Sequence, residues 1–204
     1  MNEGCSMPKA FTEEERIKIK EALMETALDL FHDKGTKSLS IAELTKRVGI
    51  AQGSFYHFWK DKGALIIELI VYRSNQKLRN SEKKFSTSLT NPAAFLTDMI
   101  YKSSIDLMTK IQSQPIYQDA FKLFEVKGKN EVHKIEILYQ DFLAKLIQYW
   151  EQNNAVKRVD KKGLMSAFIG SSVLCSQCYQ FDKSYFNDVL QTFISGIVNK
   201  YIEV

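Results

Sequence analysis

The sequence has few of the residues that build covalently cross-linked folds, and it has no long apolar run. It contains three cysteines and three prolines in 204 residues. An odd number of cysteines in a chain of this length does not make a disulfide framework. No apolar run approaches the roughly 18–20 residues that a membrane span needs, and the N-terminus lacks the pattern of a secretory signal. We therefore expect a cytoplasmic protein with no membrane partner.

Groups of residues typical of enzymes are also missing. The three histidines, His32, His57 and His133, are scattered along the chain. We find no catalytic triad, phosphate-binding glycine loop, metal-ligand cluster or pair of carboxylates at a plausible spacing. The sequence therefore predicts no enzyme, no catalytic residue, no metal site and no cofactor.

Cys175 and Cys178 form a CxxC motif in an apolar stretch. Zinc would need two more ligands, and neither a second CxxC nor a histidine lies nearby in the sequence. We expect two small buried side chains in the middle of a helix. A thiol-sensing role is the alternative.

Apolar residues spaced by three and four recur along the whole chain, which indicates helices. Hydrophobic residues make up 45% of the sequence, enough for a core. We find no convincing strand and expect an all-α fold. Caps, glycines and prolines place about nine helices, at approximately 12–34, 41–48, 52–58, 62–84, 92–112, 115–127, 131–153, 160–181 and 184–204.

Residues 40–62 read SIAELTKRVGIAQGSFYHFWKDK and predict two short helices joined by a tight turn. Ser40 can cap the first helix, and Gly49 can take the left-handed conformation that ends it. A second short helix follows, with Phe55 and Phe58 on one face as expected core residues. This is the layout of a helix-turn-helix, whose second helix enters the major groove of DNA.

This stretch resembles the DNA-binding domain of TetR/AcrR-type bacterial regulators over roughly residues 12 to 65. Departures from the family pattern occur at Ala51, Phe55 and Gly63, and none removes a group that the fold requires. The matching positions are Ile41, Ala42, Val48, Gly49, Ile50, Gly53, Phe55, Tyr56, Phe58 and Lys62.

The resemblance implies that double-stranded operator DNA is a partner and that particular residues contact it. Residues 34–62 carry six basic and two acidic side chains, so the positive excess of the chain lies on this segment, where it favours phosphate binding. Gln52 can pair with adenine, and Tyr56 is either a DNA contact or a packed aromatic. The predicted DNA-binding residues are Ser40, Lys46, Gln52, Gly53, Ser54, Tyr56, His57 and Lys62.

The family layout divides the chain into a flexible tail (1–10), a helix-turn-helix domain (11–62) and a ligand-binding and dimerisation domain (63–204). The third part is rich in aromatic residues, and the resemblance implies a pocket there for a small hydrophobic or aromatic effector. For each candidate lining residue, an ordinary role in the hydrophobic core is about as good an explanation as ligand binding. The candidate lining residues are Phe95, Met99, Phe121, Phe124, Tyr139, Phe142 and Phe168.

The resemblance also implies a homodimer that is built from the last two helices and reads a palindrome. Small residues such as Gly170 and Gly196 would let these helices approach closely. The expected function is a ligand-responsive repressor, and the alternative is a helix-turn-helix protein that has no small-molecule ligand. The predicted interface residues are Leu164, Ser171, Cys175, Phe186, Leu190, Phe193 and Ile197.

Overall fold

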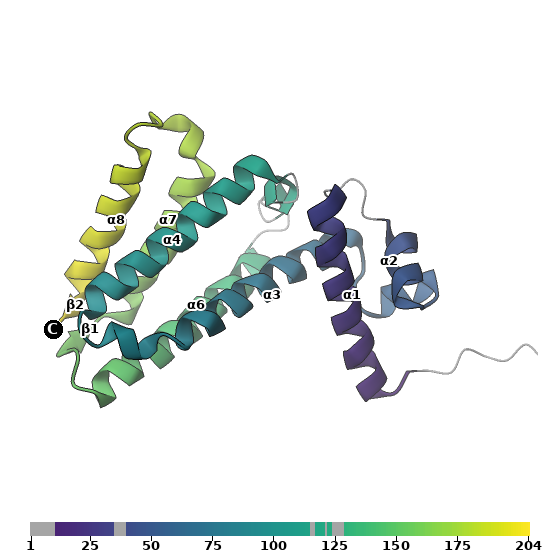
Figure 1. Ribbon diagram of the computed structural model, residues 1–204, viewed down its shortest axis with the longest axis horizontal. Helices are drawn as coiled ribbons and strands as arrows, with labels where there is room; N and C mark the ends of the chain where they lie inside the picture. The colour runs from purple at the N-terminus through teal and green to yellow at the C-terminus, as the bar shows by residue number, and fades with distance from the viewer. Residues whose placement is uncertain (1–10, 35–39, 115–116, 121, 124–128) are drawn as a thin grey trace, which may run out of the picture. The chain divides into compact units, whose positions relative to one another are not determined.

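The computed structural model describes residues 11–34, 40–114, 117–120, 122–123 and 129–204. It divides the chain into two compact units, with the boundary between Leu69 and Ile70, inside helix α3 (Lys62–Glu82). The described elements are almost all helical (Figure 1), which confirms the predicted all-α fold. No helix in this described part is both long enough and apolar enough to cross a membrane.

The first unit contains α1 (Glu13–Lys34), α2 (Ile41–Val48), the 3-10 helix η2 (Gln52–His57) and the first turns of α3. A predicted capping box opens α1, because the amide of Thr12 donates to Glu15 Oε2 over 2.8 Å and the amide of Glu15 donates to Thr12 Oγ1 over 3.2 Å. The core of the unit is made of buried apolar side chains from all four elements, among them Leu23, Ala27, Leu30, Leu44, Phe55 and Leu65.

The second unit begins with the remainder of α3 and continues through η3 (Phe85–Ser88), α4 (Pro92–Ser113) and α6 (Lys129–Gln152). It ends with β1 (Arg158–Val159), α7 (Lys161–Ser176), η4 (Cys178–Gln180), α8 (Phe186–Tyr201) and β2 (Ile202–Glu203). Helices α4, α7 and α8 lie side by side in Figure 1 and pack closely on one another.

A buried tryptophan joins distant parts of this second unit. Trp150 of α6 is fully buried, and its indole N–H donates to Ser88 Oγ over 2.7 Å across 62 positions of sequence. Beside it, the rings of Phe85 and Phe142 meet edge to face with centroids 5.6 Å apart. A buried indole needs such an acceptor, so the η3 turn and α6 are held together by packing and by one specific hydrogen bond.

Three local features differ from the sequence-based expectation. The second short helix of residues 40–62 is a 3-10 helix, not an α-helix. Strands β1 and β2 pair antiparallel, although we expected no strand, since two residues each are too short to leave an alternating pattern. The last helix begins at Phe186 and not at Ser184, because the amide and hydroxyl of Ser184 both donate to Asp182 Oδ1, over 2.8 and 2.6 Å.

The CxxC motif does not lie in the middle of a helix. Helix α7 ends at Ser176, so Cys175 is in its last turn and Cys178 begins η4. Cys175 is fully buried, as predicted, whereas Cys178 is only half-buried. The apolar spacing of this stretch continues past the point where the helix stops, which explains the error. Burial raises the pKa of the Cys175 thiol to about 12, so this cysteine is not poised to react.

Candidate nucleic-acid interface and ligand cavity

Helix α2 is closed at both ends by the residues that the sequence indicated. Ser40 Oγ accepts a hydrogen bond from the amide of Glu43 over 3.4 Å. At the other end Gly49 takes a left-handed conformation with φ 81°, and its amide donates to the carbonyl of Lys46 over 3.2 Å. Both ends are therefore set by local chemistry, which determines where the turn before η2 begins.

The two sides of the α2–η2 pair differ in exposure. Phe55 and Trp59 are buried with ring centroids 5.4 Å apart, and they anchor η2 to the core. Tyr56 is 55% exposed and meets only the edge of Phe55, at 5.5 Å between centroids. The neighbouring Gln52 and His57 are exposed too. The buried rings of Phe55 and Trp59 thus hold η2 so that Gln52, Tyr56 and His57 form an exposed edge.

Gly53 lies on this exposed edge, and the packing of the unit does not require it to be glycine. A methyl group built at its Cα would meet no atom within 4 Å, and its φ is not positive. A 3-10 helix repeats every three residues, so Gly53 and Tyr56 share one face of η2. The open space beside Gly53 is therefore available to a partner that approaches the backbone closely.

Charge on α2 is distributed unevenly. Arg47 forms an ion pair with Glu43 one turn away at 2.8 Å, which offsets part of its charge. Lys46 is exposed, and the structure records no carboxylate partner for it in the described part of the chain. The lysine is thus the cation of this helix that an outside anion can reach most freely.

A polar contact that sequence reasoning missed holds the end of η2 against the rest of the unit. The indole N–H of Trp59 donates to Glu68 Oε2 in the first turns of α3. Lys20 of α1 lies 2.6 Å from the other oxygen of the same carboxylate and 5.8 Å from the centre of the Trp59 ring. No local pattern signals this triad, because its members come from three separate segments.

The predicted DNA-binding residues all lie at or near the surface of the first unit. Ser54 and Lys62 are half-buried, and the others are exposed. Lys62 begins α3, whose first turn is capped by Asp61 Oδ1 accepting from the amide of Ala64 over 2.7 Å. Phe55 is buried as expected, and Phe58 is half-buried beside Trp59.

Comparison with known families agrees with this arrangement. The family model of the bacterial regulatory proteins of the tetR family matches residues 23–69, which cover α1 from Leu23, α2, η2 and the start of α3. In this segment the chain is similar to the TetR/AcrR-type family of transcriptional regulators. The relatives below are TetR/AcrR-type or helix-turn-helix transcriptional regulators and not enzymes, which agrees with the prediction from the sequence.

Two curated relatives match the chain over short stretches. The uncharacterised HTH-type transcriptional regulator YuxN of Bacillus subtilis is 42% identical over 57 residues, 28% of this chain and 20% of YuxN. The HTH-type transcriptional regulator AcrR of Shigella flexneri is 33% identical over 58 residues, 28% of this chain and 27% of AcrR. The matches therefore span between a fifth and just over a quarter of the length of these relatives.

The likeness of the fold extends over nearly the whole chain. The crystal structure of RolR in complex with resorcinol matches with a TM-score of 0.65, covering 93% of this chain and 90% of RolR. The sequences are 14% identical over this match, so the likeness is one of fold.

The second unit contains a cavity of about 440 Å³ between α3, α4, α6 and α7, with Tyr117 and Ala120 adding to its wall. Three of the predicted ligand-binding residues line it, namely Met99, Tyr139 and Phe168. The rings of Tyr139 and Phe168 lie side by side with centroids 4.7 Å apart. Burial raises the pKa of the Tyr139 hydroxyl, so it stays a neutral hydrogen-bond donor at physiological pH.

The remaining predicted ligand residues lie elsewhere. Phe142 is buried against Phe85 in the core and does not line the cavity. Phe95 is half-buried against the same core and does not line the cavity either. Their aromatic character serves packing, which the sequence could not distinguish from binding. Phe121 and Phe124 fall outside the described residues.

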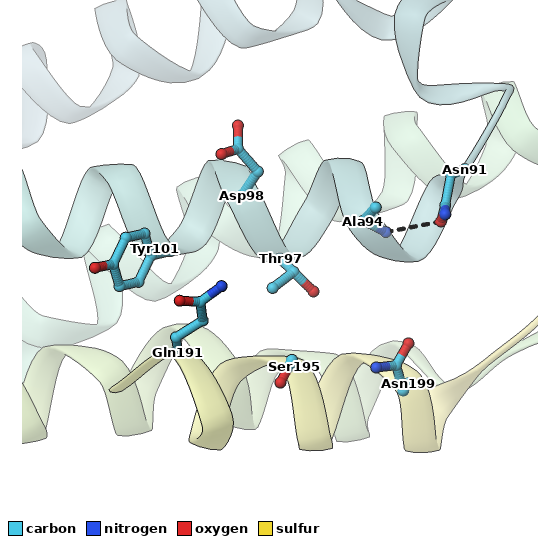
Figure 2. Close-up of a pocket in the computed structure, with 8 residues that line it drawn as sticks. All are labelled: Asn91, Ala94, Thr97, Asp98, Tyr101, Gln191, Ser195 and Asn199. Carbon is cyan, nitrogen blue, oxygen red and sulfur yellow. Dashed lines mark hydrogen bonds between the residues drawn. The ribbon is translucent and has the colours of Figure 1, made fainter. Parts of the chain in front are cut away.

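A second, smaller hollow of about 310 Å³ lies between α4 and α8. Figure 2 shows Gln191, Ser195 and Asn199 along α8 facing Thr97 and Tyr101 of α4. Asn91 also lies here, but its Oδ1 already accepts from the amide of Ala94 over 2.9 Å and caps α4. Seven of its eight lining residues have a polar side-chain group, which makes it a poorer match to a hydrophobic effector than the larger cavity.

Most of the predicted dimer-interface residues face the interior of their own protomer. Five of the seven are buried: Leu164, Ser171, Cys175, Phe186 and Leu190. Helices α7 and α8 use these residues to pack on α4 and on each other, and the predicted interface stays a prediction. The other two, Phe193 and Ile197, are half-buried.

The small residues on these helices also act within the protomer. A side chain built at Gly170 would come within 2.3 Å of the Phe193 ring, so the glycine lets α7 and α8 pack closely. Large apolar side chains that remain exposed on α7 are Ile169, 49% exposed, and Val173, 56% exposed, and both are among the residues that line the cavity.

Proposed function

We propose that this chain is a homodimeric, ligand-responsive transcriptional regulator, a repressor that binds palindromic operator DNA and is released by a small hydrophobic or aromatic effector. The observation that carries the proposal is the outward edge of η2, which is rigidly anchored by Phe55 and Trp59 and exposes Gln52 and Tyr56. The cavity of the second unit supports the effector part of the proposal.

In this proposal the η2 edge enters the major groove. Gln52 forms a bidentate pair with adenine, and Tyr56 contacts a phosphate or a thymine methyl group. Gly53 lets the backbone approach the DNA, and Lys46 adds attraction to phosphate that does not depend on sequence. Residues at the start of a recognition helix read base edges in helix-turn-helix proteins, which is the position that Gln52 holds.

One six-residue recognition element makes few base contacts. Two copies related by a twofold axis, about 34–36 Å apart, would read two half-sites on one face of DNA. The outward face of α7, with Ile169 and Val173, is our candidate for the contact between copies, since exposed large apolar side chains favour association.

Helix α3 is the physical link that we propose between effector and DNA. Its residues Leu65 and Leu69 are buried in the core of the first unit, while Arg73, Lys77 and Ser81 line the cavity of the second. An effector that binds one orientation of α3 better than another would shift the population of DNA-binding states. The alternative function, a regulator without a ligand, would be favoured by a filled second unit, and the cavity argues against it.

The direct test is a gel-shift titration of the full chain with the DNA upstream of its own gene, at moderate salt with nonspecific competitor. We expect a discrete complex on a palindromic segment that scrambled DNA does not form. The variant Gln52→Ala should weaken it, and Gln148→Ala, an exposed glutamine on α6, should leave it unchanged. Equal binding to scrambled DNA would contradict the proposal.

A further inference from the structure

The cavity of the second unit has a charged wall in addition to its apolar one. Arg73 and Lys77 of α3 and Lys110 of α4 line it, and Glu136 of α6 is the carboxylate among the described lining residues. Cations therefore outnumber carboxylates on the wall. Partial burial of three cations is costly unless anions offset their charge.

The two lysines share a single carboxylate. Both Lys77 Nζ and Lys110 Nζ donate to Asp106 Oδ2, the second over 2.8 Å. One carboxylate balances one ammonium group, so the trio keeps a net positive charge at the wall. Burial lowers the pKa of Lys77, and the hydrogen bond to Asp106 opposes this. An anion that entered the cavity would offset the positive charge that Asp106 leaves unbalanced.

Arg73 reinforces this charge. It lies four residues before Lys77, on the same face of α3, and the structure records no ion pair for it anywhere in the described part of the chain. Glu136, for its part, lies 3.5 Å from His133 Nδ1 on its own helix. An arginine can grip a carboxylate through two parallel hydrogen bonds, so Arg73 is well suited to an anionic group that enters the cavity.

The hydroxyl groups on the wall do not compete for this role, because several are already used. Ser104 Oγ donates to the carbonyl of Ile100 over 2.8 Å. Ser171 Oγ and Ser172 Oγ both donate to the carbonyl of Phe168, over 3.0 and 3.1 Å. The hydroxyl groups of these serines donate to backbone carbonyls of their own helices. They therefore do not offer a free donor to a ligand at this part of the cavity wall.

Charge and apolar surface lie toward different ends of α4. Met99 and Ile100 line the cavity eleven and ten residues before Lys110, which places them roughly 15 Å from it along the helix axis. Phe168 and Met165 of α7 add to the apolar side. The cavity thus offers a cationic end and an apolar end to one elongated occupant.

We propose that the cavity binds an amphiphilic organic anion, in which one carboxylate or similar group is held by Arg73, Lys77 and Lys110 and an apolar body extends toward Met99 and Phe168. This inference rests on the proposed function and names the chemical class of its effector. The apolar body is either an alkyl chain or an aromatic ring system, and the test below distinguishes the two.

The test is calorimetric titration of the full chain with matched probes, each used below its micelle concentration. Dodecanoate is compared with 1-dodecanol and dodecyltrimethylammonium, and 1-naphthoate with 1-naphthalenemethanol. We expect at least one anion to bind about tenfold or more tightly than its neutral counterpart, since a hydrogen bond to a charged group contributes enough for such a factor. Which anion binds identifies the shape of the apolar body.

Variants of Lys77 and Lys110 test whether these residues cause the preference for an anion. The double variant Lys77→Met and Lys110→Met should remove the advantage of the anion, whereas Lys110→Arg, which keeps the charge, should retain it. Lys102→Met is the matched control, because Lys102 lies on the same helix, pairs with Asp98 at 2.8 Å and is largely exposed. Circular dichroism checks that each variant keeps its helical content.

Several outcomes would overturn the inference. Equal binding of an anion and its neutral counterpart would do so, as would tighter binding of the cation, no binding of either anion, or full anion binding by the folded double variant. The gel-shift assay of operator binding shows whether the effector class or the DNA-binding function is wrong. A chain that binds its operator but no anion refutes the effector class alone, and a chain that binds the anion but no operator refutes the DNA-binding role alone.

Discussion

The two units of this chain are specified over very different distances of sequence. In the first unit, the caps of α2 and the turn into η2 are made by residues three or four positions apart, such as Ser40 with Glu43. In the second, Trp150 meets Ser88 across 62 positions, and Lys77 meets Asp106 across 29. The caps and turns of the first unit can therefore be predicted from its sequence, although its contacts among Lys20, Trp59 and Glu68 cannot. The second unit depends more on contacts that no local pattern shows.

The largest effect that we expect comes from breaking the long-range core of the second unit. Trp150→Ala removes a fully buried side chain and should lower the free energy of unfolding by about 3–5 kcal/mol. Urea denaturation followed by circular dichroism measures the loss. Tyr179→Ala, which truncates an aromatic that is 76% exposed, is the control and should change little. A loss below 1 kcal/mol for Trp150→Ala would show that this core is not what holds the unit.

The next effect concerns function in the first unit, without a change in stability. Gln52→Ala should weaken operator binding by about 1–3 kcal/mol, because a bidentate pair with adenine is lost. Its exposed side chain contributes little to folding, so the thermal midpoint should stay the same. Fluorescence anisotropy on a set of single-base operator variants measures both affinity and specificity. Uniform weakening on every sequence would mean that Gln52 contacts only the backbone of DNA.

A smaller effect separates the two roles of Ser40. Ser40→Ala removes the cap of α2 and should cost about 0.5–2 kcal/mol of stability, while Ser40→Asp keeps a cap but places a negative charge toward phosphate. We therefore expect the aspartate variant to be stable and to bind DNA less well. Ser86→Ala, at an exposed position of η3, is the control. If both Ser40 variants were equally destabilised, the cap would not be the reason.

The smallest effect is a dependence of stability on pH in the second unit. The pKa of Asp106 is lowered because hydrogen bonds from Lys110 and Lys77 outweigh the opposing effect of burial. Its contribution to stability is therefore present above its ordinary pKa of 3.8 and is lost as the pH falls through the lowered folded value. The groups are partly exposed, so the change should stay below about 1 kcal/mol.

Asp106→Asn should remove that part of the acid dependence when unfolding is measured between pH 5 and the acid limit of folding. Asp98→Asn, which affects the exposed pair with Lys102, is the matched control. An unchanged pH profile in the Asp106 variant would show that other carboxylates dominate the acid response.

The sequence predicted many of the helix caps, but fewer of the residues that line the cavity. The capping box at Thr12, the caps at Ser40, Asp61 and Asp160, and the left-handed Gly49 were all found where local chemistry placed them. The 3-10 character of η2 was not predicted, because its apolar spacing fits either kind of helix. Among the ligand residues, Met99, Tyr139 and Phe168 line the cavity while Phe142 is core, a distinction that composition cannot make.

By itself, the sequence determined the caps that open several helices and which segment resembles a TetR/AcrR-type DNA-binding domain, because capping, helix propensity and apolar spacing act over a few residues. Only the tertiary structure decided which face of α7 and α8 is buried, which aromatics surround a cavity and which cations meet at Asp106. These features depend on side chains from separate helices coming within a few ångströms of one another, and that proximity arises only when the whole unit packs.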